Sequence, residues 1–321
     1  MIHVVLAGNY PAHTAERLQA LLPQGQYRFS VADTQERYDG MTDAQVLILR
    51  VFRASKEVMD RNPGLNMIMR WGAGVDSVDL AAAGERGILV TNTPGANAAA
   101  VSELAVMMML AVGRRLLCHT ESLNSGLWSK NTYLNSSFCL NGKLVGIIGG
   151  GNIGRQVAAK AAAFGARIQY FDPYRLPEET EQALNMRYVS LEELISTSDI
   201  ITLHIPLLDS TRHIIGEKEL AAMKQGAILI NTARGGLVDD RALAEAVRRG
   251  RLAGAGLDVV EREPLPAGDE LLTEPNIIVT PHIGGGTADI ADVIIPMLAE
   301  DLKTYLDGVR PAHVVNSQYL A

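Results

Sequence analysis

The stretch VGIIGGGNIGR, residues 145–155, decides the fold class of this chain. Its apolar run ends in three glycines, Gly149, Gly151 and Gly154, which are spaced as G-x-G-x-x-G ahead of a helix-forming run. Between a strand and a helix, such glycines permit a tight turn, close approach of the backbone to a pyrophosphate, and packing of the helix on the strand. Free N–H groups at the helix start then bind the phosphates. The stretch therefore predicts a dinucleotide-binding unit.

The segment after this unit supports the same interpretation. The run ARIQYFD, residues 166–172, predicts the next strand and ends in Asp172, 23 residues after Gly149. A carboxylate at this position accepts hydrogen bonds from an adenosine ribose and repels the additional phosphate of NADP, so NAD is the expected cofactor. Arg175, three residues later, would weaken the preference for NAD over NADP, because its positive charge can pair with the additional phosphate. The alternative for the whole motif is a glycine-rich turn that binds nothing.

Short β-branched runs alternate with helical stretches along the whole chain, which is typical of α/β folds with parallel sheets. A chain of 321 residues is long for one core, so two domains are expected. A long buried helix is predicted from about residue 98 to 118. The predicted strands form two series, at 2–7, 44–50, 65–70 and 87–92, and then at 143–149, 166–172, 199–204, 227–231, 254–259 and 276–280.

Composition narrows the class of partner. A net charge of -7 and a pI near 5.5 argue against binding to nucleic acid or to an anionic membrane. The longest apolar block, residues 104–112, is about half the length that crosses a bilayer. Only Cys118 and Cys139 are present, and the seven histidines are dispersed, so neither a disulfide framework nor a metal site is expected. We therefore expect a soluble cytoplasmic protein with small-molecule partners.

Four chemically active side chains follow the later predicted strands. Arg234 follows AILIN, Asp258 and Glu263 lie in GLDVVEREP, and His282 follows NIIVTP. Parallel sheets place their ligand crevices at the carboxyl ends of the strands, so these side chains are expected on the cofactor side. Together these side chains fit hydride transfer between a nicotinamide and a carbonyl. Histidine can exchange the proton, and a carboxylate can orient the imidazole. Arginine can bind a substrate carboxylate through two hydrogen bonds.

Each of these residues also has an ordinary structural interpretation. A single histidine at a strand end is often a satisfied structural group, and Glu263 would be one charge on a solvated turn. Their convergence behind a dinucleotide motif favours the catalytic interpretation for Arg234, Glu263 and His282 together.

Several long motifs, in order, resemble the D-isomer-specific 2-hydroxyacid dehydrogenase family. They are NTPGANAAAVSELAVMMML, GKLVGIIGGGNIGR, HIPLLDSTRHIIG, INTARGGLVDD, GLDVVEREP and TPHIGGGT, and the likeness spans roughly residues 45 to 290. The resemblance is nearest to phosphoglycerate dehydrogenase-like members. It implies an NAD-dependent oxidoreductase acting on a 2-hydroxy or 2-keto acid. It also assigns the catalytic arginine, acid and proton donor to Arg234, Glu263 and His282.

The family resemblance further implies a discontinuous architecture. A Rossmann NAD-binding domain, residues 98–284, would be inserted in a flavodoxin-like substrate domain, residues 1–97 and 285–321. Both would be doubly wound parallel sheets. Closure on binding would place hinges near Asn97 and Gly285. A homodimer is also implied.

Further residues are carried over from the family's motifs. On the substrate side, backbone at Ala73, Gly74 and Val75 would hold the carboxylate, Asn97 would face the same site, and Arg50 would face a substrate phosphate. On the cofactor side, the implied contacts are Asn152 and Ile153 at the pyrophosphate, His204, Pro206 and Thr211 at the adenosine and ribose, and Ala233 and Asp258 at the nicotinamide. The alternatives are a core histidine at His204 and a surface charge at Arg50.

The identity of the substrate stays open at this point. The loop RWGAGVD is similar to that of phosphoglycerate dehydrogenases, which favours 3-phosphoglycerate, but Trp71 departs from the small residue expected there and would narrow the pocket or pack beneath it. No regulatory extension is expected after the last helix, so hydroxypyruvate or glyoxylate reduction is the main alternative. A NAD(H)-sensing corepressor, which uses the same scaffold for binding, is the alternative from another class.

Overall fold

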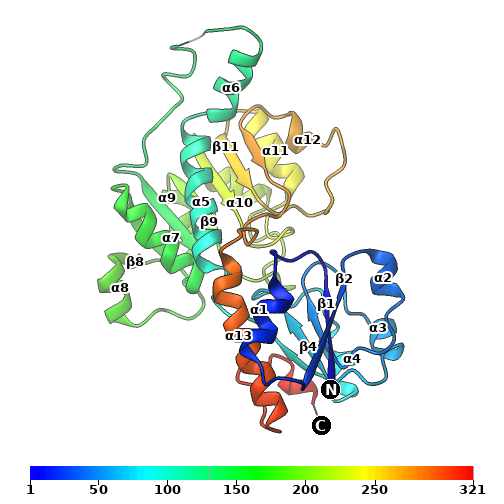
Figure 1. Ribbon diagram of the computed structural model, residues 1–321. Helices are drawn as coiled ribbons and strands as arrows, with labels where there is room; N and C mark the ends of the chain where they lie inside the picture. The colour runs from blue at the N-terminus through cyan, green and yellow to red at the C-terminus, as the bar shows by residue number, and fades with distance from the viewer. Residues whose placement is uncertain (129, 321) are drawn as a thin grey trace. The chain divides into compact units, whose positions relative to one another are not determined.

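The computed structural model describes residues 1–128 and 130–320, and the chain divides into two compact α/β units (Figure 1). Unit 1 contains Met1–Asn97 and the segment from Thr287 onward, and unit 2 contains Ala98–Gly286. The chain therefore passes from one unit to the other twice, after Asn97 and after Gly286.

Unit 1 is built on a five-stranded parallel sheet in the order β2-β1-β3-β4-β5. This is the flavodoxin-like doubly wound order. The strands are β1 (Ile2–Ala7), β2 (Tyr27–Ala32), β3 (Val46–Leu49), β4 (Met67–Arg70) and β5 (Leu89–Thr91).

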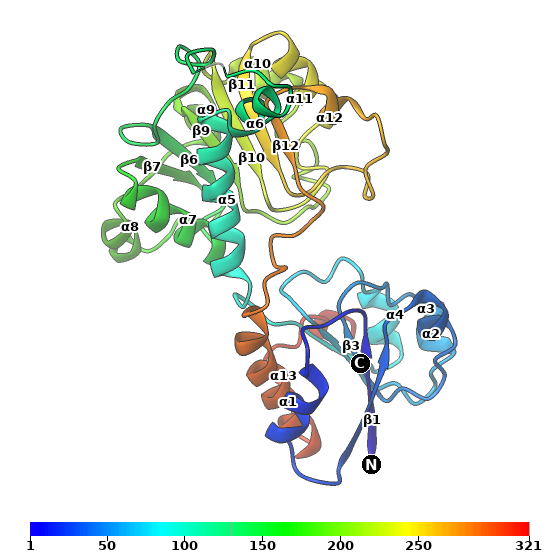
Figure 2. The ribbon, with the colours of Figure 1, turned by 45° about the horizontal axis from the view of Figure 1, so that its top comes forward.

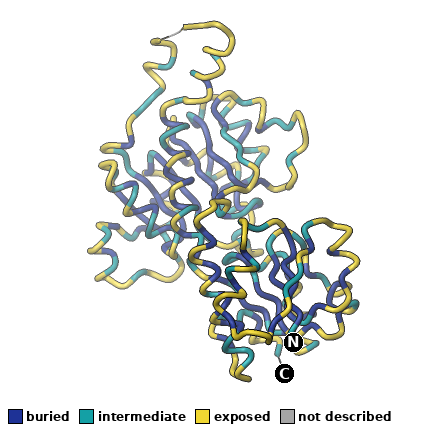
Figure 3. The backbone as a smooth tube through the Cα atoms, in the orientation of Figure 1, coloured by how far each residue is buried: buried dark blue, intermediate teal, exposed yellow. Residues whose placement is uncertain are grey.

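Helices cover both faces of this sheet, which is why its central strands are apolar throughout. One face packs against α1 (Thr14–Leu21) and α13 (Ile290–Leu306), and the other against α2 (Gln35–Asp39), α3 (Lys56–Asp60) and α4 (Leu80–Glu85). All four residues of β3 are fully buried. Figure 3 shows the same concentration of buried backbone along the strands of each unit.

Unit 2 is built on a seven-stranded parallel sheet in the order β12-β11-β10-β9-β6-β7-β8. The order reverses between β6 and β9, so this is a Rossmann sheet with one additional strand, and ligands bind at such a switch point. The strands are β6 (Leu144–Ile148), β7 (Arg167–Phe171), β8 (Met186–Tyr188), β9 (Ile200–Leu203), β10 (Ala227–Asn231), β11 (Leu252–Leu257) and β12 (Ile277–Val279). The predicted fold class of two doubly wound domains is confirmed.

The helices of unit 2 also lie on both faces. On one face α5 (Ala98–Gly113) packs on β10, β11 and α7 (Asn152–Ala163), as Figure 2 shows for α5. The opposite face carries α9 (Leu191–Thr197), α10 (Glu217–Ala222) and α11 (Asp240–Arg248). The remaining helices are α6 (Leu116–Asn124), α8 (Glu178–Leu184) and α12 (Glu270–Thr273).

One local prediction was wrong, and two strands were not predicted. The helix predicted over 98–118 is two helices, because Arg115 has a φ of 49° and this left-handed residue separates α5 from α6. Strands β2 and β8 were not predicted. Both lie at sheet edges, where polar residues alternate with apolar ones and the apolar run is short.

No helix among the described residues is long and apolar enough to cross a membrane. Cys118 is buried and Cys139 is exposed, and both are free thiols.

Candidate active site

The glycine motif forms the turn between β6 and α7. Gly149 has a φ of 107°, and a Cβ there would lie 2.5 Å from the carbonyl oxygen of His204. A Cβ at Gly154 would lie 2.0 Å from the carbonyl oxygen of Gly149, so neither position accepts a larger residue. At Gly151, by contrast, a Cβ would meet nothing within 4 Å, which leaves open space over the backbone. Two of the glycines are thus required by packing, and the middle one exposes the backbone.

This turn fits a dinucleotide. The backbone N–H groups of Asn152 and Ile153, in the first turn of α7, donate no hydrogen bond to any described residue, so they are available to a phosphate. Asp172, just beyond β7, accepts hydrogen bonds from the amides of Gly150 at 2.8 Å and Tyr174 at 2.9 Å. These bonds fix the carboxylate beside the glycine turn, where a ribose is expected.

Arg175 is committed elsewhere. Its guanidinium forms a two-point ion pair with Glu181, at 2.9 and 2.8 Å, and lies over the ring of Tyr188. This pair, together with a hydrogen bond from Tyr170, lowers the pKa of Glu181 to about 2. Arg175 therefore reaches a ribose phosphate only by breaking a strong contact.

The loop after β9 carries the other residues predicted at the adenosine side. His204 Nε2 lies 2.9 Å from Thr202 Oγ1, while Nδ1 is buried and has no partner among the described residues. Burial lowers the pKa of His204 to about 3, so the ring is neutral at physiological pH. Thr211 Oγ1 donates to the carbonyl of Pro206 and accepts from the amide of Leu208, both at 2.8 Å, and thereby organises the loop.

Asn231, at the end of β10, shapes the turn that carries Arg234. Its side chain accepts from the amide of Ala233 at 3.0 Å and donates to the carbonyl of Arg234 at 2.8 Å. A Cβ at Gly235 would lie 1.8 Å from the carbonyl oxygen of Val260, so this turn lies directly on the loop after β11. Arg234 is partly buried at this position.

Asp258 holds the loop that carries His282. The carboxylate is 2% exposed and accepts from Thr280 Oγ1 at 2.6 Å and from the amides of Ile283 at 2.8 Å and Gly284 at 2.7 Å. The amide of His282 also donates to the carbonyl of Asp258 at 2.9 Å. The predicted contact of Asp258 with the nicotinamide stays a prediction, because the described bonds all serve this loop.

Glu263 and His282 are brought together from different loops. Glu263 Oε2 lies 2.9 Å from His282 Nδ1, and the two side chains are 40% and 51% exposed. His282 has a φ of 54°, which turns the chain sharply after Pro281. Because Nδ1 is engaged, Nε2 is the ring atom left to exchange a proton with a substrate.

A cavity of about 470 Å³ adjoins this pair. Both side chains line it, together with apolar residues that include Val260, Leu265 and Leu272. An apolar wall around an exposed histidine–carboxylate pair is typical of a reaction site.

The substrate-side loop predicted at residues 73–75 follows β4 in unit 1. Arg70 Nε donates to the carbonyl of Gly74 at 2.9 Å, and Asn92 Nδ2 donates to that of Ala73 at 2.6 Å. The amides of Ala73, Gly74 and Val75 donate to no described residue. With carbonyls bound and amides free, the loop suits an anionic group.

Three further residues of unit 1 were predicted near the substrate. Arg50, just after β3, donates a guanidinium hydrogen bond to the carbonyl of Asn9. Asn97 Oδ1 is buried and lacks a partner among the described residues. Trp71 is 6% exposed and packs edge-on against Tyr10 with ring centres 5.0 Å apart. Trp71 was expected either to narrow the substrate pocket or to pack beneath it, and its burial agrees with the second expectation.

Asn231 and Thr280 were not predicted as site residues, although their side chains form the hydrogen bonds that hold the two loops carrying Arg234 and His282. A polar residue directly after a buried strand was the available signal. Within residues 1–128 and 130–320, no group of three or more histidine, cysteine or acidic side chains could hold a metal ion.

This sheet order and this glycine turn define a dinucleotide-binding α/β protein. The sequence pattern described as "D-isomer specific 2-hydroxyacid dehydrogenase, NAD binding domain" matches residues 106–284. The chain thus belongs to the D-isomer-specific 2-hydroxyacid dehydrogenase family. The predictions of this family, of an oxidoreductase and of NAD as cofactor are confirmed.

Individual relatives give the same result. D-3-phosphoglycerate dehydrogenase of Methanocaldococcus jannaschii is 41% identical over 284 residues, 88% of this chain but only 53% of that protein. Glyoxylate reductase of Thermococcus litoralis is 40% identical over 273 residues, 84% of this chain and 82% of that protein. The solved structure of the TT0316 protein from Thermus thermophilus covers 98% of this chain and 100% of its own, with a TM-score of 0.86 and 38% identity.

Proposed function

We propose that this protein interconverts a 2-keto acid and the corresponding D-2-hydroxy acid, with His282 as the proton donor and acceptor. The observation that carries the proposal is the 2.9 Å contact between His282 Nδ1 and Glu263 Oε2 at the carboxyl edge of the Rossmann sheet. A nicotinamide cofactor, held by the glycine turn and by Asp172, would supply the hydride for reduction of the carbonyl carbon.

His282 and Glu263 divide the proton chemistry between them. Glu263 orients the imidazole through its contact with Nδ1. Nε2 then donates its proton to the carbonyl oxygen as negative charge develops there, and accepts it in the reverse reaction. The buried bonds of Asp258 keep the backbone of His282 in place during both steps.

Substrate binding is assigned to one side chain of unit 2 and to polar groups of unit 1. Arg234 would grip the substrate carboxylate and stabilise charge on the carbonyl oxygen. In unit 1, the free amides of residues 73–75 would bind an anionic group of the substrate, and Asn97 is proposed as a further polar residue toward the substrate. In this proposal residues 98–284 bind the cofactor, while residues 1–97 and 285–321 bind the substrate.

Two substrate classes follow from these residues. Arg50 next to the loop after β3 supports a phosphorylated acid such as 3-phosphoglycerate. The alternative is glyoxylate or hydroxypyruvate, which is supported by the 40% identity to the glyoxylate reductase of Thermococcus litoralis.

The test is NADH oxidation by purified protein with phosphohydroxypyruvate, hydroxypyruvate, glyoxylate, pyruvate and branched 2-keto acids, each repeated with NADPH. His282→Ala should abolish turnover while NADH still binds, as measured by fluorescence titration. Loss of phosphohydroxypyruvate activity in Arg50→Ala, with glyoxylate activity retained, would assign the phosphate role to Arg50. NADH binding without turnover of any acid would contradict the enzyme proposal and support a NAD(H)-sensing binding protein.

A homodimer is proposed from an exposed apolar arm in unit 2. The segment that contains α6 stands out from the sheet in Figure 1. It exposes Leu116, Leu123, Leu127, Leu134 and, at 86%, Trp128. An apolar groove of about 610 Å³ lies nearby between α5 and α7.

A second copy of this chain would cover such surfaces. Sedimentation should give a dimer that Leu127→Asp dissociates, and a monomeric wild-type protein would contradict this proposal. The two free cysteines also support a reducing location, for which we propose the cytoplasm.

A further inference from the structure

A second set of polar side chains lies at the carboxyl edge of the unit 2 sheet, outside the residues assigned above. His213 comes from the loop after β9, Asp240 follows the loop after β10, and Glu261 lies in the loop after β11. Arg234 and Glu263 occupy two of the same loops, and Glu261 is separated from Glu263 by one residue.

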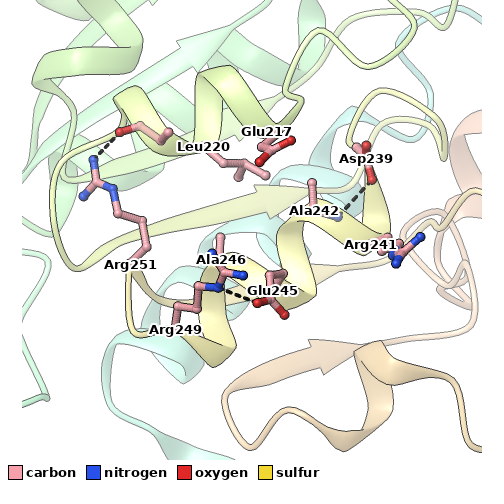
Figure 4. A pocket seen from close by; sticks show the side chains of 10 residues that line it. Glu217, Leu220, Asp239, Arg241, Ala242, Glu245, Ala246, Arg249 and Arg251 are labelled. Carbon is pink, nitrogen blue, oxygen red and sulfur yellow. Dashed lines mark hydrogen bonds and ion pairs between the residues drawn. The ribbon is translucent and has the colours of Figure 1, made fainter.

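The backbone amides of Asp240 and Glu261 each point at the side-chain carboxylate of the other residue. The amide of Glu261 donates to Asp240 Oδ2 at 2.8 Å, and the amide of Asp240 approaches Glu261 Oε1 at 3.4 Å. Asp240 is the first residue of α11, but the helix does not need its carboxylate as a cap. Asp239 performs that role by accepting from the amide of Ala242 at 2.9 Å, the dashed contact in Figure 4. The Asp240 carboxylate is therefore committed to the neighbouring loop.

His213 extends the connection to the third loop. Its Nε2 lies 2.7 Å from Glu261 Oε1, and its backbone amide donates to the carbonyl of Gly236 at 2.8 Å. The turn at Gly235 touches the backbone of Val260 so closely that no Cβ fits between them. The loops after β9, β10 and β11 thus share one continuous set of bonds.

We propose that His213, Asp240 and Glu261 form a clasp that fixes the loop after β11 and so positions Glu263 against His282. The effect on turnover, through the position of Glu263, rests on the proposed function. The effect on the order of the loop after β11 does not depend on that function. These three are positioning residues, because none contacts His282 in the described structure. Loosening the clasp is expected to lower the rate of turnover and to leave cofactor binding unchanged.

The clasp responds to pH through Asp240. Burial, with the nearby carboxylates of Glu261, Asp269 and Asp239, raises the pKa of Asp240 to about 6, although the hydrogen bond from the Glu261 amide opposes this. The imidazole of His213 reaches the same group through Glu261. An ionised carboxylate accepts a hydrogen bond more strongly than a neutral one, so the clasp is tighter above pH 6 than below it.

The test compares Asp240→Ala and Asp240→Asn with a matched control, Glu217→Ala. Glu217 is exposed on α10 across a groove from α11 (Figure 4). Hydrogen exchange of the segment 258–264 measures the clasp directly. We expect exchange of the Glu261 amide to rise about tenfold in Asp240→Ala, the scale of one lost charge-assisted hydrogen bond, and to stay unchanged in Glu217→Ala. Unchanged exchange in Asp240→Ala overturns the proposal.

Steady-state kinetics measure the consequence for Glu263. In Asp240→Ala, kcat is expected to fall about tenfold with the KM for NADH within about twofold. The ratio of the kcat of Asp240→Asn to that of wild type should be near one below pH 6 and fall above pH 7, because only wild type gains an ionised acceptor. A pH-independent ratio, or an equal loss in Glu217→Ala, overturns the positioning role.

The two proposals fail in distinguishable ways. If wild-type protein turns over none of the 2-keto acids, the proposed function fails, and the exchange rate in Asp240→Ala still decides whether the clasp holds the loop. If wild type is active and exchange is unaffected, the clasp fails alone.

Discussion

Replacing His204 by glutamine is expected to make unfolding of the protein less sensitive to acid. His204 Nδ1 is buried without a partner among the described residues, and burial lowers the pKa of the ring from 6.5 to about 3. The unfolded chain therefore binds a proton at pH values where the folded protein does not. The stability tied to a neutral His204 is complete above pH 6.5 and is lost as the pH falls toward 3.

The size of the effect follows from this difference in pKa. One pKa unit corresponds to about 1.4 kcal/mol. Protonation of His204 in the unfolded chain therefore lowers the free energy of unfolding by about 2 kcal/mol between pH 7.5 and pH 5. Glutamine does not titrate, and His204→Gln should lack this loss even if its stability at pH 7.5 is lower.

Urea titrations followed by circular dichroism at pH 7.5 and pH 5, on cofactor-free protein, measure the change for both chains. His13→Gln, at an exposed position, is the control. If the free energies of wild type and His204→Gln fall in parallel between the two pH values, the ring is not held neutral by burial and the reasoning is refuted.

Three further predictions concern the site. Glu263→Gln should lower kcat about 100-fold with little change in the KM for NADH, because the imidazole loses its charged partner; steady-state kinetics with unchanged kcat would contradict the pairing with His282. Gly154→Ala should weaken NADH binding by more than about tenfold in a fluorescence titration, because its Cβ would lie 2.0 Å from the carbonyl of Gly149, and wild-type affinity would contradict this packing. Asp172→Ser should raise the ratio of kcat/KM for NADPH to that for NADH by about tenfold or more, because repulsion of the phosphate is removed; an unchanged ratio would assign the preference for NAD to another group.

The central strands were predictable because they are buried on both faces. Runs such as those of β3 and β10 are apolar at nearly every position, so they stand out without any knowledge of their neighbours. The edge strands β5 and β12 still carry apolar runs and were predicted, whereas β2 and β8 mix polar with apolar residues and were missed. The break between α5 and α6 depends on the backbone conformation of Arg115, which no local pattern marks.

The candidate site was predictable to a similar degree. The glycine turn and the residues Arg234, Glu263 and His282 follow from motifs, since each is local in sequence. The supporting bonds are not local. Thr280 and Asp258 meet across two strands, and Asp240 and Glu261 meet across two loops. Such pairs are fixed by strand order, which the sequence does not display.

Because unit 1 is built from two separate segments of the chain, it cannot complete its fold until the second segment has been synthesised. Unit 2 is one unbroken stretch, whereas the sheet of unit 1 has one face covered by α13, which contributes Ile290, Ile294 and Leu298 to its core. Residues 1–97 therefore emerge with that apolar face covered by α1 alone, and the remaining part stays uncovered until about 190 more residues have been made. The part that is synthesised first is the part that finishes folding last, so chaperone contacts during synthesis are expected to concentrate on the amino-terminal sheet.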